Sequence, residues 1–335
     1  MLLSFIIPAY NAQSHIERCI NSILNQNLDH ADYEIIVVND GSTDQTASIV
    51  SGLVKRFPNI VLLCKSNNGP GAARNTGLRI AQGQYILFID ADDYLIAQSM
   101  YNLLHLAIDS DLDILMGDFI HDKNGAIQIK NANFRQNTQE IMSGKQFLKT
   151  NEISWTVWVY LFKRDFLNKH GLIFREASNG TDTDFSLKSI FYACKIQYVK
   201  TFFYCWVYRK GSVSHSHWTL QKMADAASSL AAMKTFALLV KNEDDLIDLI
   251  FGKHMTAKSM GYIKRNTSLG FTQTKLACQW IKNEYIDSRL LVSQSLSSWS
   301  MQLLIKTSPS LAAAIMMLAK YVHIRIARLR YTCDS

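Results

Sequence analysis

The sequence of 335 residues has few prolines, no long hydrophobic run and no paired cysteines. It holds 4 prolines, and no stretch reaches the roughly 18 consecutive apolar residues that a membrane span needs. Its first residues lack the basic segment and the cleavage site of a signal peptide. None of its 6 cysteines lies in a C-x-x-C pair, which favours free thiols in a reducing compartment. We therefore expect a cytoplasmic protein, either free or peripheral on the inner face of the plasma membrane.

Basic charge is concentrated in the last third of the chain. Residues 1–215 carry 20 Lys and Arg against 20 Asp and Glu, whereas residues 216–335 carry 15 against 8. Such a basic segment could pack on the rest of the protein, bind nucleic acid or lie on an anionic membrane surface. Nucleic acid is the least favoured partner, because no recognition motif accompanies the charge.

Apolar runs alternate with amphipathic patterns through most of residues 1–215. They predict strands at residues 3–8, 33–38, 60–64, 85–89, 113–116 and 198–208, and helices at about 14–27, 45–56, 70–81 and 143–150. This alternation predicts an α/β fold, in which helices flank a mostly parallel mixed sheet.

Residues 216–335 are expected to form a mainly helical appendage. Its last helix would begin at Ser308, with Pro309 at the first helical position. Apolar residues recur on one face of this helix and basic residues occupy the remainder: Leu311, Ile315, Leu318, Val322, Ile326 and Leu329 against Lys320, Arg325, Arg328 and Arg330. The pattern fits a helix at a membrane interface as well as one that docks on the first domain.

Three carboxylates follow the predicted strand at 85–89, namely Asp90, Asp92 and Asp93. Open α/β sheets bind their ligands just past the carboxyl ends of the strands. Carboxylates this close repel one another unless a cation lies among them, and a divalent cation would also hold a phosphate. The alternative interpretation is a solvated acidic turn before a helix.

The first three predicted strands also end in polar or glycine-rich turns. These turns are Pro8-Ala9-Tyr10-Asn11, Asn39-Asp40-Gly41-Ser42 and the segment Asn67–Arg74. Each is common by itself. Because four such turns would meet at one edge of a parallel sheet, together they suit a nucleotide diphosphate and its metal.

This combination resembles the inverting family 2 glycosyltransferases of GT-A fold. The resemblance covers about residues 3–215 and is strongest over 4–93. It implies a Rossmann-like catalytic domain at 1–215, with 216–335 as the helical appendage. It also implies a nucleotide-sugar donor, UDP-linked, and a glycan or lipid-linked glycan acceptor of bacterial surface polysaccharide assembly.

The family pattern assigns donor contacts to the strand-end turns. Pro8, Ala9 and Tyr10 would pack on the nucleotide base, Asp40 would hydrogen-bond the uracil, and Arg74 would lie near the nucleotide. The family often has two aspartates in the second turn, whereas this chain has an asparagine before Asp40.

The family's D-x-D motif falls on Asp90-Ala91-Asp92. Asp92 would coordinate Mn²⁺ or Mg²⁺ and Asp90 would lie by the ribose, so that the metal offsets charge on the leaving diphosphate. Asp93 is a further candidate for the metal or for the acceptor and sugar pocket.

An inverting transfer also needs a base that takes the proton of the acceptor hydroxyl. The family has Glu-Asp at the head of a helix, followed by an aromatic residue, and here Asp182 and Phe185 match while Thr181 replaces the glutamate. Asp182 is therefore the predicted base, and Asp184 is the alternative. A helix cap is the non-catalytic interpretation of Thr181 or Asp182.

Four further residues are candidates by their position. Trp158 could stack on a sugar ring, although most of residues 158–167 read as a core helix with a charged face. Arg209 or Lys210 could approach the diphosphate, although exposed basic residues are usually just solvated. His215 could add a metal ligand, as in some GT-A enzymes, or could be an ordinary loop histidine.

The sequence therefore predicts a metal-dependent inverting glycosyltransferase, and two other functions stay open. A sugar nucleotidyltransferase uses a related sheet, but favours a glycine-rich loop with Arg or Lys after the first strand, where this chain has Pro8-Ala9-Tyr10-Asn11. A catalytically silent sugar- or membrane-binding protein is disfavoured by the joint presence of Asp90, Asp92 and Asp182.

Overall fold

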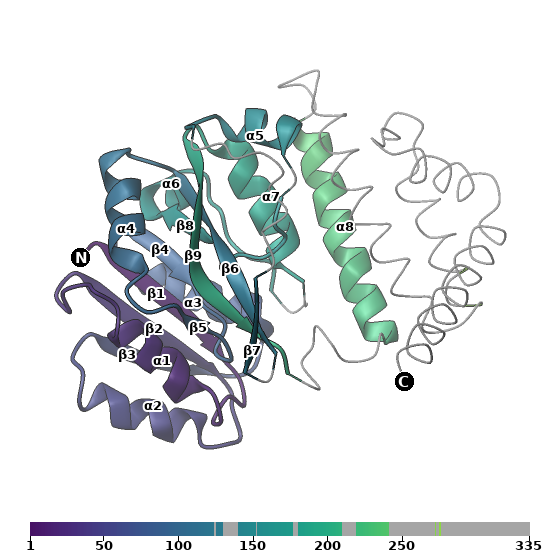
Figure 1. Cartoon of the computed structure of the whole chain (residues 1–335). Coiled ribbons are helices and arrows are strands. Elements are labelled where there is room, and N and C mark those ends of the chain that lie inside the picture. Colours follow the sequence, from purple (N-terminus) through teal and green to yellow (C-terminus); the bar gives the residue numbers. More distant parts are fainter. Residues whose placement is uncertain are drawn as a thin grey trace, which may run out of the picture. The chain divides into compact units, whose positions relative to one another are not determined.

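The computed structural model describes residues 1–123, 125–129, 140–151, 153–176, 180–209, 219–240, 272 and 275. The chain divides into two compact units, Met1–His215 and Ser216–Ser335. The first unit holds a mixed sheet flanked by helices, and the second contains helix α8, Leu220–Val240 (Figure 1). Lys210, His215 and the predicted helix that begins at Ser308 lie outside the described residues. Within the described ranges, no helix is both long and apolar enough to cross a bilayer.

The first half of the unit Met1–His215 confirms the predicted alternation of strands and helices. Its elements are β1 Leu3–Ala9, α1 Ile16–Leu24, β2 Tyr33–Asp40, α2 Thr46–Val54, β3 Ile60–Lys65, α3 Gly69–Ile80 and β4 Tyr85–Phe88. Every residue of β2 and β4 is buried, as expected for central strands covered on both faces. The buried residues of α1 recur at helical spacing and include Cys19, which packs as a core residue.

The sheet has the order β3-β2-β1-β4-β8-β6-β9-β5, with β7 paired to β6. Strands β1 to β4 are mutually parallel, and β6 is parallel to β9. Strand β8, Tyr160–Lys163, lies antiparallel between β4 and β6. From β1 through β2 to β3 the chain moves across the sheet in one direction, and from β3 to β4 it moves back in the other. Because such crossovers are right-handed, α1 and α2 lie on one face of the sheet and α3 covers the opposite face.

The second half of this unit differs more from the sequence prediction. Its elements are β5 Tyr94–Leu95, α4 Met100–Asp109, β6 Ile114–Lys123, β7 Ala126–Ile129, α5 Gly144–Thr150, β8 Tyr160–Lys163, α6 Arg164–Lys169, α7 Asp182–Tyr192 and β9 Ile196–Val207. The sequence did not predict α4 or β5. The expected core helix at 158–167 is instead β8 followed by the short helix α6, because Leu161 pairs with Leu87 of β4 in the sheet.

A close approach between α3 and the chain before α7 positions the site. A Cβ atom at Gly71 would lie 2.2 Å from the backbone oxygen of Arg175, so only glycine permits this contact. Further along α3, Asn75 donates to the backbone oxygen of Phe174 at 2.9 Å and accepts from its N–H at 2.8 Å. These contacts hold α3 against the segment that leads into α7.

Candidate active site

The carboxyl ends of β1, β2, β3 and β4 lie together at one edge of the sheet. Strand β1 is flanked by β2 on one side and β4 on the other, and the connections that follow β1 and β4 leave in opposite directions. Ligands of open α/β sheets bind in the crevice that such a reversal creates. The four predicted turns therefore share one site, as their positions in the sequence indicated.

The turns after β1 and β2 are tied together by hydrogen bonds. The Asn11 N–H donates to Ser42 Oγ at 3.0 Å, and Asn11 Oδ1 accepts from the Thr43 N–H at 2.9 Å. Tyr10 is 52% exposed beside this junction, whereas Ala9 is buried and Pro8 half-buried. Tyr10 is thus the member of the first turn whose ring is available to a planar ligand.

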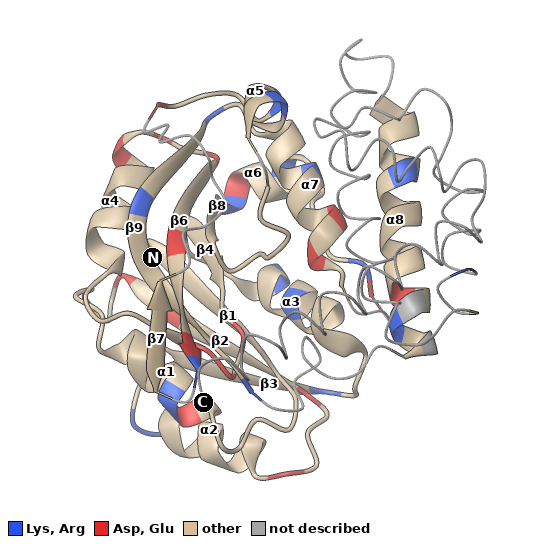
Figure 2. Ribbon diagram, turned by 45° about the vertical axis from the view of Figure 1, so that its right-hand side comes forward, with Lys and Arg blue, Asp and Glu red and all other residues tan. Residues whose placement is uncertain are grey.

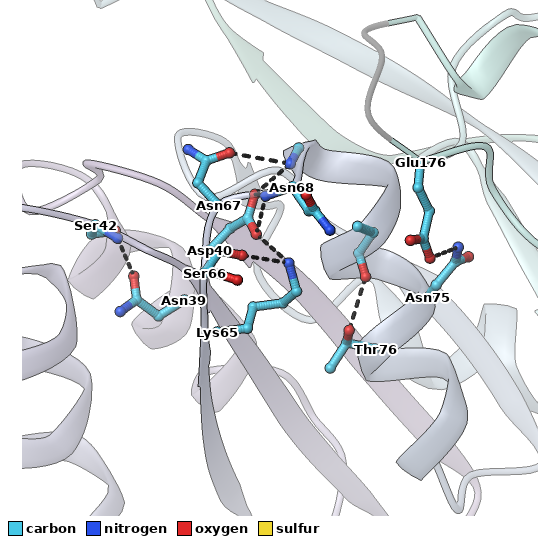
Figure 3. Close-up of polar contacts among 12 residues, drawn as sticks. Asn39, Asp40, Ser42, Lys65, Ser66, Asn67, Asn68, Asn75, Thr76 and Glu176 are labelled. Atoms are coloured by element: carbon cyan, nitrogen blue, oxygen red, sulfur yellow. Dashed lines mark hydrogen bonds and ion pairs between the residues drawn. The ribbon is translucent and has the colours of Figure 1, made fainter.

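Asp40, at the end of β2, accepts hydrogen bonds from the start of α3 and from a lysine (Figure 3). The N–H groups of Asn68 and Gly69 donate to its carboxylate at 3.1 and 2.8 Å. Lys65 Nζ lies 2.7 Å from Asp40 Oδ1 and 2.7 Å from the Ser66 backbone oxygen. The carboxylate therefore satisfies the first N–H groups of α3, which have no partner within the helix.

Arg74 joins the two halves of the site. Its guanidinium donates from Nη1 to Asp182 Oδ1 at 2.6 Å and from Nη2 to Asp90 Oδ1 at 2.8 Å. The side chain is buried and lies over the ring of Phe174, with 5.3 Å from Cζ to the ring centroid. Figure 2 shows the acidic first turn of α7 beside the basic residues of α3. One arginine thus brings together carboxylates that lie far apart in the sequence.

Charge and burial act in opposite directions on this cluster. Burial raises the pKa of Asp90 to about 6, against the effect of Arg74 and with the help of Asp92 and Asp182. Burial alone would lower the pKa of Arg74, but the Asp182 and Asp90 carboxylates raise it above its ordinary value. Arg74 is therefore a fixed positive charge that the two carboxylates share.

Asp182 begins α7, as the family pattern predicts. Thr181 is the N-cap residue, but its side chain makes no capping bond, so the capping interpretation is not what the structure shows. The Asp182 side chain is 22% exposed, and among the described residues its Oδ2 atom has no protein partner. Asp184, the alternative base, is buried and pairs with Arg175 at 2.9 Å and with Lys188 at 3.4 Å. It is a structural residue, so Asp182 is the better candidate.

Two arginines hold Asp92. The Arg209 guanidinium pairs with its carboxylate, and Arg18 donates to its backbone oxygen at 2.6 Å. Burial, followed by Arg209 and Arg18, lowers the pKa of the neighbouring His15. Arg209 and Arg18 thus place two positive charges beside Asp92, and these charges would also attract phosphate groups.

Asp93 does not line a ligand pocket, contrary to one of our predictions. It is buried and accepts from Tyr204 Oη at 2.7 Å and from the Val207 N–H at 2.8 Å. Tyr204 Oη in turn accepts from the Asp90 N–H at 3.2 Å. Burial and the Asp92 and Asp90 carboxylates raise the pKa of Asp93. Asp93 thus anchors the acidic turn to β9.

Replacing Tyr204 with Phe should loosen this anchor. The change leaves one oxygen of the buried Asp93 without its donor, which costs about 1–3 kcal/mol of folding stability. A nucleotide that binds at this edge should also bind about tenfold more weakly, because the turn that carries Asp92 is no longer held. Calorimetric titration with UDP and Mn²⁺ measures this effect.

Tyr198→Phe is the matched control, since Tyr198 is also on β9 and donates to the buried Asp118 at 2.8 Å. It should lose similar stability but bind the nucleotide normally. Equal nucleotide affinity in both variants would contradict the anchoring role of Tyr204.

Trp158 also belongs to the core and not to a sugar pocket. It is buried, and its ring stacks on Tyr204 with centroids 4.4 Å apart and an angle of 11°. The ring of Phe119 meets it edge-on at 4.7 Å. Because these rings already cover Trp158, the prediction that it contacts the acceptor sugar is wrong. Its ring instead supports Tyr204.

The predicted divalent cation would need oxygen or nitrogen donor atoms from side chains at this edge of the sheet. Within the described ranges, no three His, Cys, Asp or Glu side chains are arranged as a metal site. Magnesium needs fewer protein ligands, since one or two carboxylates commonly hold it together with substrate phosphates and water. Asp92, with Asp90 two residues before it, fits a cation that arrives with a diphosphate.

Sequence reasoning missed three residues that shape the site: Arg18, Lys65 and Tyr204. Arg18 and Tyr204 lie in an amphipathic helix and an aromatic strand, where nothing local distinguishes them. The position of Lys65 could have been predicted, because parallel pairing of the second and third strands places it beside Asp40.

The fold resembles that of a solved protein. TarS residues 1–349 from S. aureus, solved in complex with UDP-GlcNAc, match with a TM-score of 0.73 and 19% identity. The alignment covers 96% of this chain and 92% of that one. The chain therefore has the GT-A fold that the sequence predicts.

The sequence comparisons give the family. Residues 4–170 match the family model described as Glycosyl transferase family 2, and the chain belongs to that family. A glycosyltransferase of Escherichia coli, YibD, is 30% identical over 64% of this chain and 64% of its own length. EpsJ of Bacillus subtilis is 35% identical over 52% of each. The matches therefore span between half and two thirds of these relatives.

Proposed function

We propose that this protein is a metal-dependent inverting glycosyltransferase that moves a sugar from UDP to a glycan or lipid-linked glycan acceptor. The observation that carries the proposal is the bridge from Arg74 to Asp90 and Asp182. It brings the helix that bears the candidate base to the strand edge that suits a nucleotide. Family membership supports the reaction class, and the UDP-GlcNAc bound by TarS supports UDP as the carrier.

The site residues have distinct roles in this proposal. Tyr10 stacks on the base, Asp40 reads its edge, and Asp90 lies by the ribose. Arg209 pairs with the donor diphosphate in place of Asp92, and the Asp92 carboxylate would hold Mn²⁺ or Mg²⁺. When bound, the metal supplies positive charge that stabilises the leaving group.

Asp182 supplies the base. Its Oδ2 atom takes the proton of the acceptor hydroxyl while the hydroxyl oxygen forms a bond to the anomeric carbon. The bond from that carbon to the diphosphate oxygen breaks, and UDP departs with the electron pair. Because attack and departure occur on opposite faces of the carbon, the configuration inverts. Arg74 keeps Oδ1 of Asp182 fixed, which leaves Oδ2 for the acceptor.

A thermal-shift panel of nucleotide sugars with and without Mn²⁺ tests the donor and the metal together. A ligand at about one hundred times its Kd adds about 2.7 kcal/mol of stability. This raises the melting temperature by roughly 5 °C in a domain of this size. We expect such a shift with a UDP-sugar and Mn²⁺, and its loss when EDTA removes the metal.

Two results would contradict parts of the proposal. An equal shift in EDTA would remove the metal from it. Stabilisation by UDP-sugars without UDP release, in the presence of polysaccharide and lipid-linked acceptors, would indicate a silent sugar-binding protein instead.

A further inference from the structure

We infer that Lys65, together with Asp40, selects the nucleobase of the donor. The pair would bind only bases whose edge carries a C=O group next to an N–H group. This inference rests on the proposed function and names a specificity residue for it. Uracil has such an edge, at O4 and N3–H. Cytosine has an amino group and an unprotonated nitrogen at the same two places.

The position of Lys65 follows from strand register. Asp40 and Lys65 are paired residues at the carboxyl ends of the parallel strands β2 and β3. Paired residues of neighbouring strands point to the same side of a sheet. Figure 3 shows the Lys65 ammonium and the Asp40 carboxylate facing each other beside the start of α3. The pair therefore lies at the sheet edge next to the turn that carries Tyr10.

The donors and acceptors of this pair are only partly used. The Lys65 ammonium has three N–H groups, and the described contacts take two of them, to Asp40 Oδ1 and the Ser66 backbone oxygen. Asp40 Oδ1 also accepts from the Asn68 N–H, so that oxygen is filled. Oδ2 accepts from the Gly69 N–H at 2.8 Å and, at 3.3 Å, shares the Asn68 N–H with Oδ1, so its second contact is long. One unused cationic donor and one weakly engaged anionic acceptor thus lie side by side.

Exposure makes Lys65 the larger contact of the two. Its side chain is 22% exposed, whereas that of Asp40 is 4% exposed. A base that enters beside Tyr10 therefore meets the ammonium and one carboxylate oxygen. A C=O group can accept from the ammonium while the adjacent N–H donates to the carboxylate. With cytosine, an amino group would face the ammonium and a nitrogen lone pair would face the carboxylate, so both contacts would be repulsive.

Competition binding with UDP and CDP tests this inference on the full chain with Mn²⁺ present. We expect the wild-type protein to bind UDP about 100-fold more tightly than CDP. In Lys65→Met, UDP affinity should fall about tenfold and the preference over CDP should shrink, because one charge-assisted hydrogen bond is lost. Lys65→Gln keeps a neutral hydrogen-bond donor, so its UDP affinity should lie between those of the wild-type protein and Lys65→Met.

Lys195→Met is the control, since it removes a partly exposed lysine that pairs with Asp111 at 3.7 Å, away from this site. It should leave both affinities unchanged. Unchanged UDP affinity and selectivity in Lys65→Met, with a normal melting temperature, would overturn the role of Lys65 and leave the proposed function intact. A wild-type protein that binds no nucleoside diphosphate would overturn the proposed function itself.

Discussion

Replacing Asp182 with Asn is expected to lower kcat by a factor of about 10²–10⁴, the usual contribution of a general base. Asparagine has nearly the same shape and can still accept the hydrogen bond from Arg74, so the site should keep its geometry. It cannot take the proton of the acceptor hydroxyl. UDP affinity should therefore stay within about twofold of the wild-type value. Release of UDP in the presence of acceptor measures kcat, and calorimetry measures donor binding.

Asp165→Asn provides a matched control for this change. Asp165 lies in the first turn of a helix, as Asp182 does, and pairs with Arg164 at 3.8 Å, but its side chain is 78% exposed. It should retain full activity. Normal turnover in Asp182→Asn would show that another group accepts the proton, and would remove Asp182 from the mechanism.

Replacing Arg74 with Met should destabilise the protein by about 3 kcal/mol. The change leaves the Asp90 and Asp182 carboxylates without their shared counterion. Breaking a buried pair typically costs about 3–5 kcal/mol. The low end applies here because these side chains are 33% and 22% exposed. Urea unfolding followed by circular dichroism measures the free energy of unfolding.

Two further variants make the Arg74 prediction specific. Arg79→Met changes an exposed arginine of the same helix and should alter stability by less than about 0.5 kcal/mol. Arg74→Lys should recover only part of the loss, because one ammonium cannot match the fork that donates to two carboxylates. A stable Arg74→Met protein with normal turnover would mean that the bridge between the two halves of the site is unimportant.

The first half of the fold could be predicted from the sequence because each strand is a continuous apolar run and each helix is amphipathic. Parallel strands then forced the turns after β1, β2, β3 and β4 to one edge. The second half was harder to predict. Residues 158–167 carry apolar residues that suit a buried helix as well as a strand, and pairing with β4 decides between them.

The chemistry of individual residues depended on partners that are distant in the sequence. Asp92 and Asp93 are adjacent and look equivalent, yet Arg209 pairs with the first while Tyr204 holds the second in the interior. Trp158 could face a sugar or the core, and the Tyr204 ring decides in favour of the core. Such outcomes depend on the course of β9, which local sequence patterns do not contain.

A crystal structure of the protein with UDP and Mn²⁺ tests the central claim most directly. We predict the uracil beside Tyr10 and Lys65, the diphosphate near Arg209, the metal on Asp92, and Asp182 Oδ2 facing the place where the transferred sugar would lie. Nucleotide bound away from the carboxyl ends of β1 to β4, or bound there with Asp182 turned away from the diphosphate, would contradict the account.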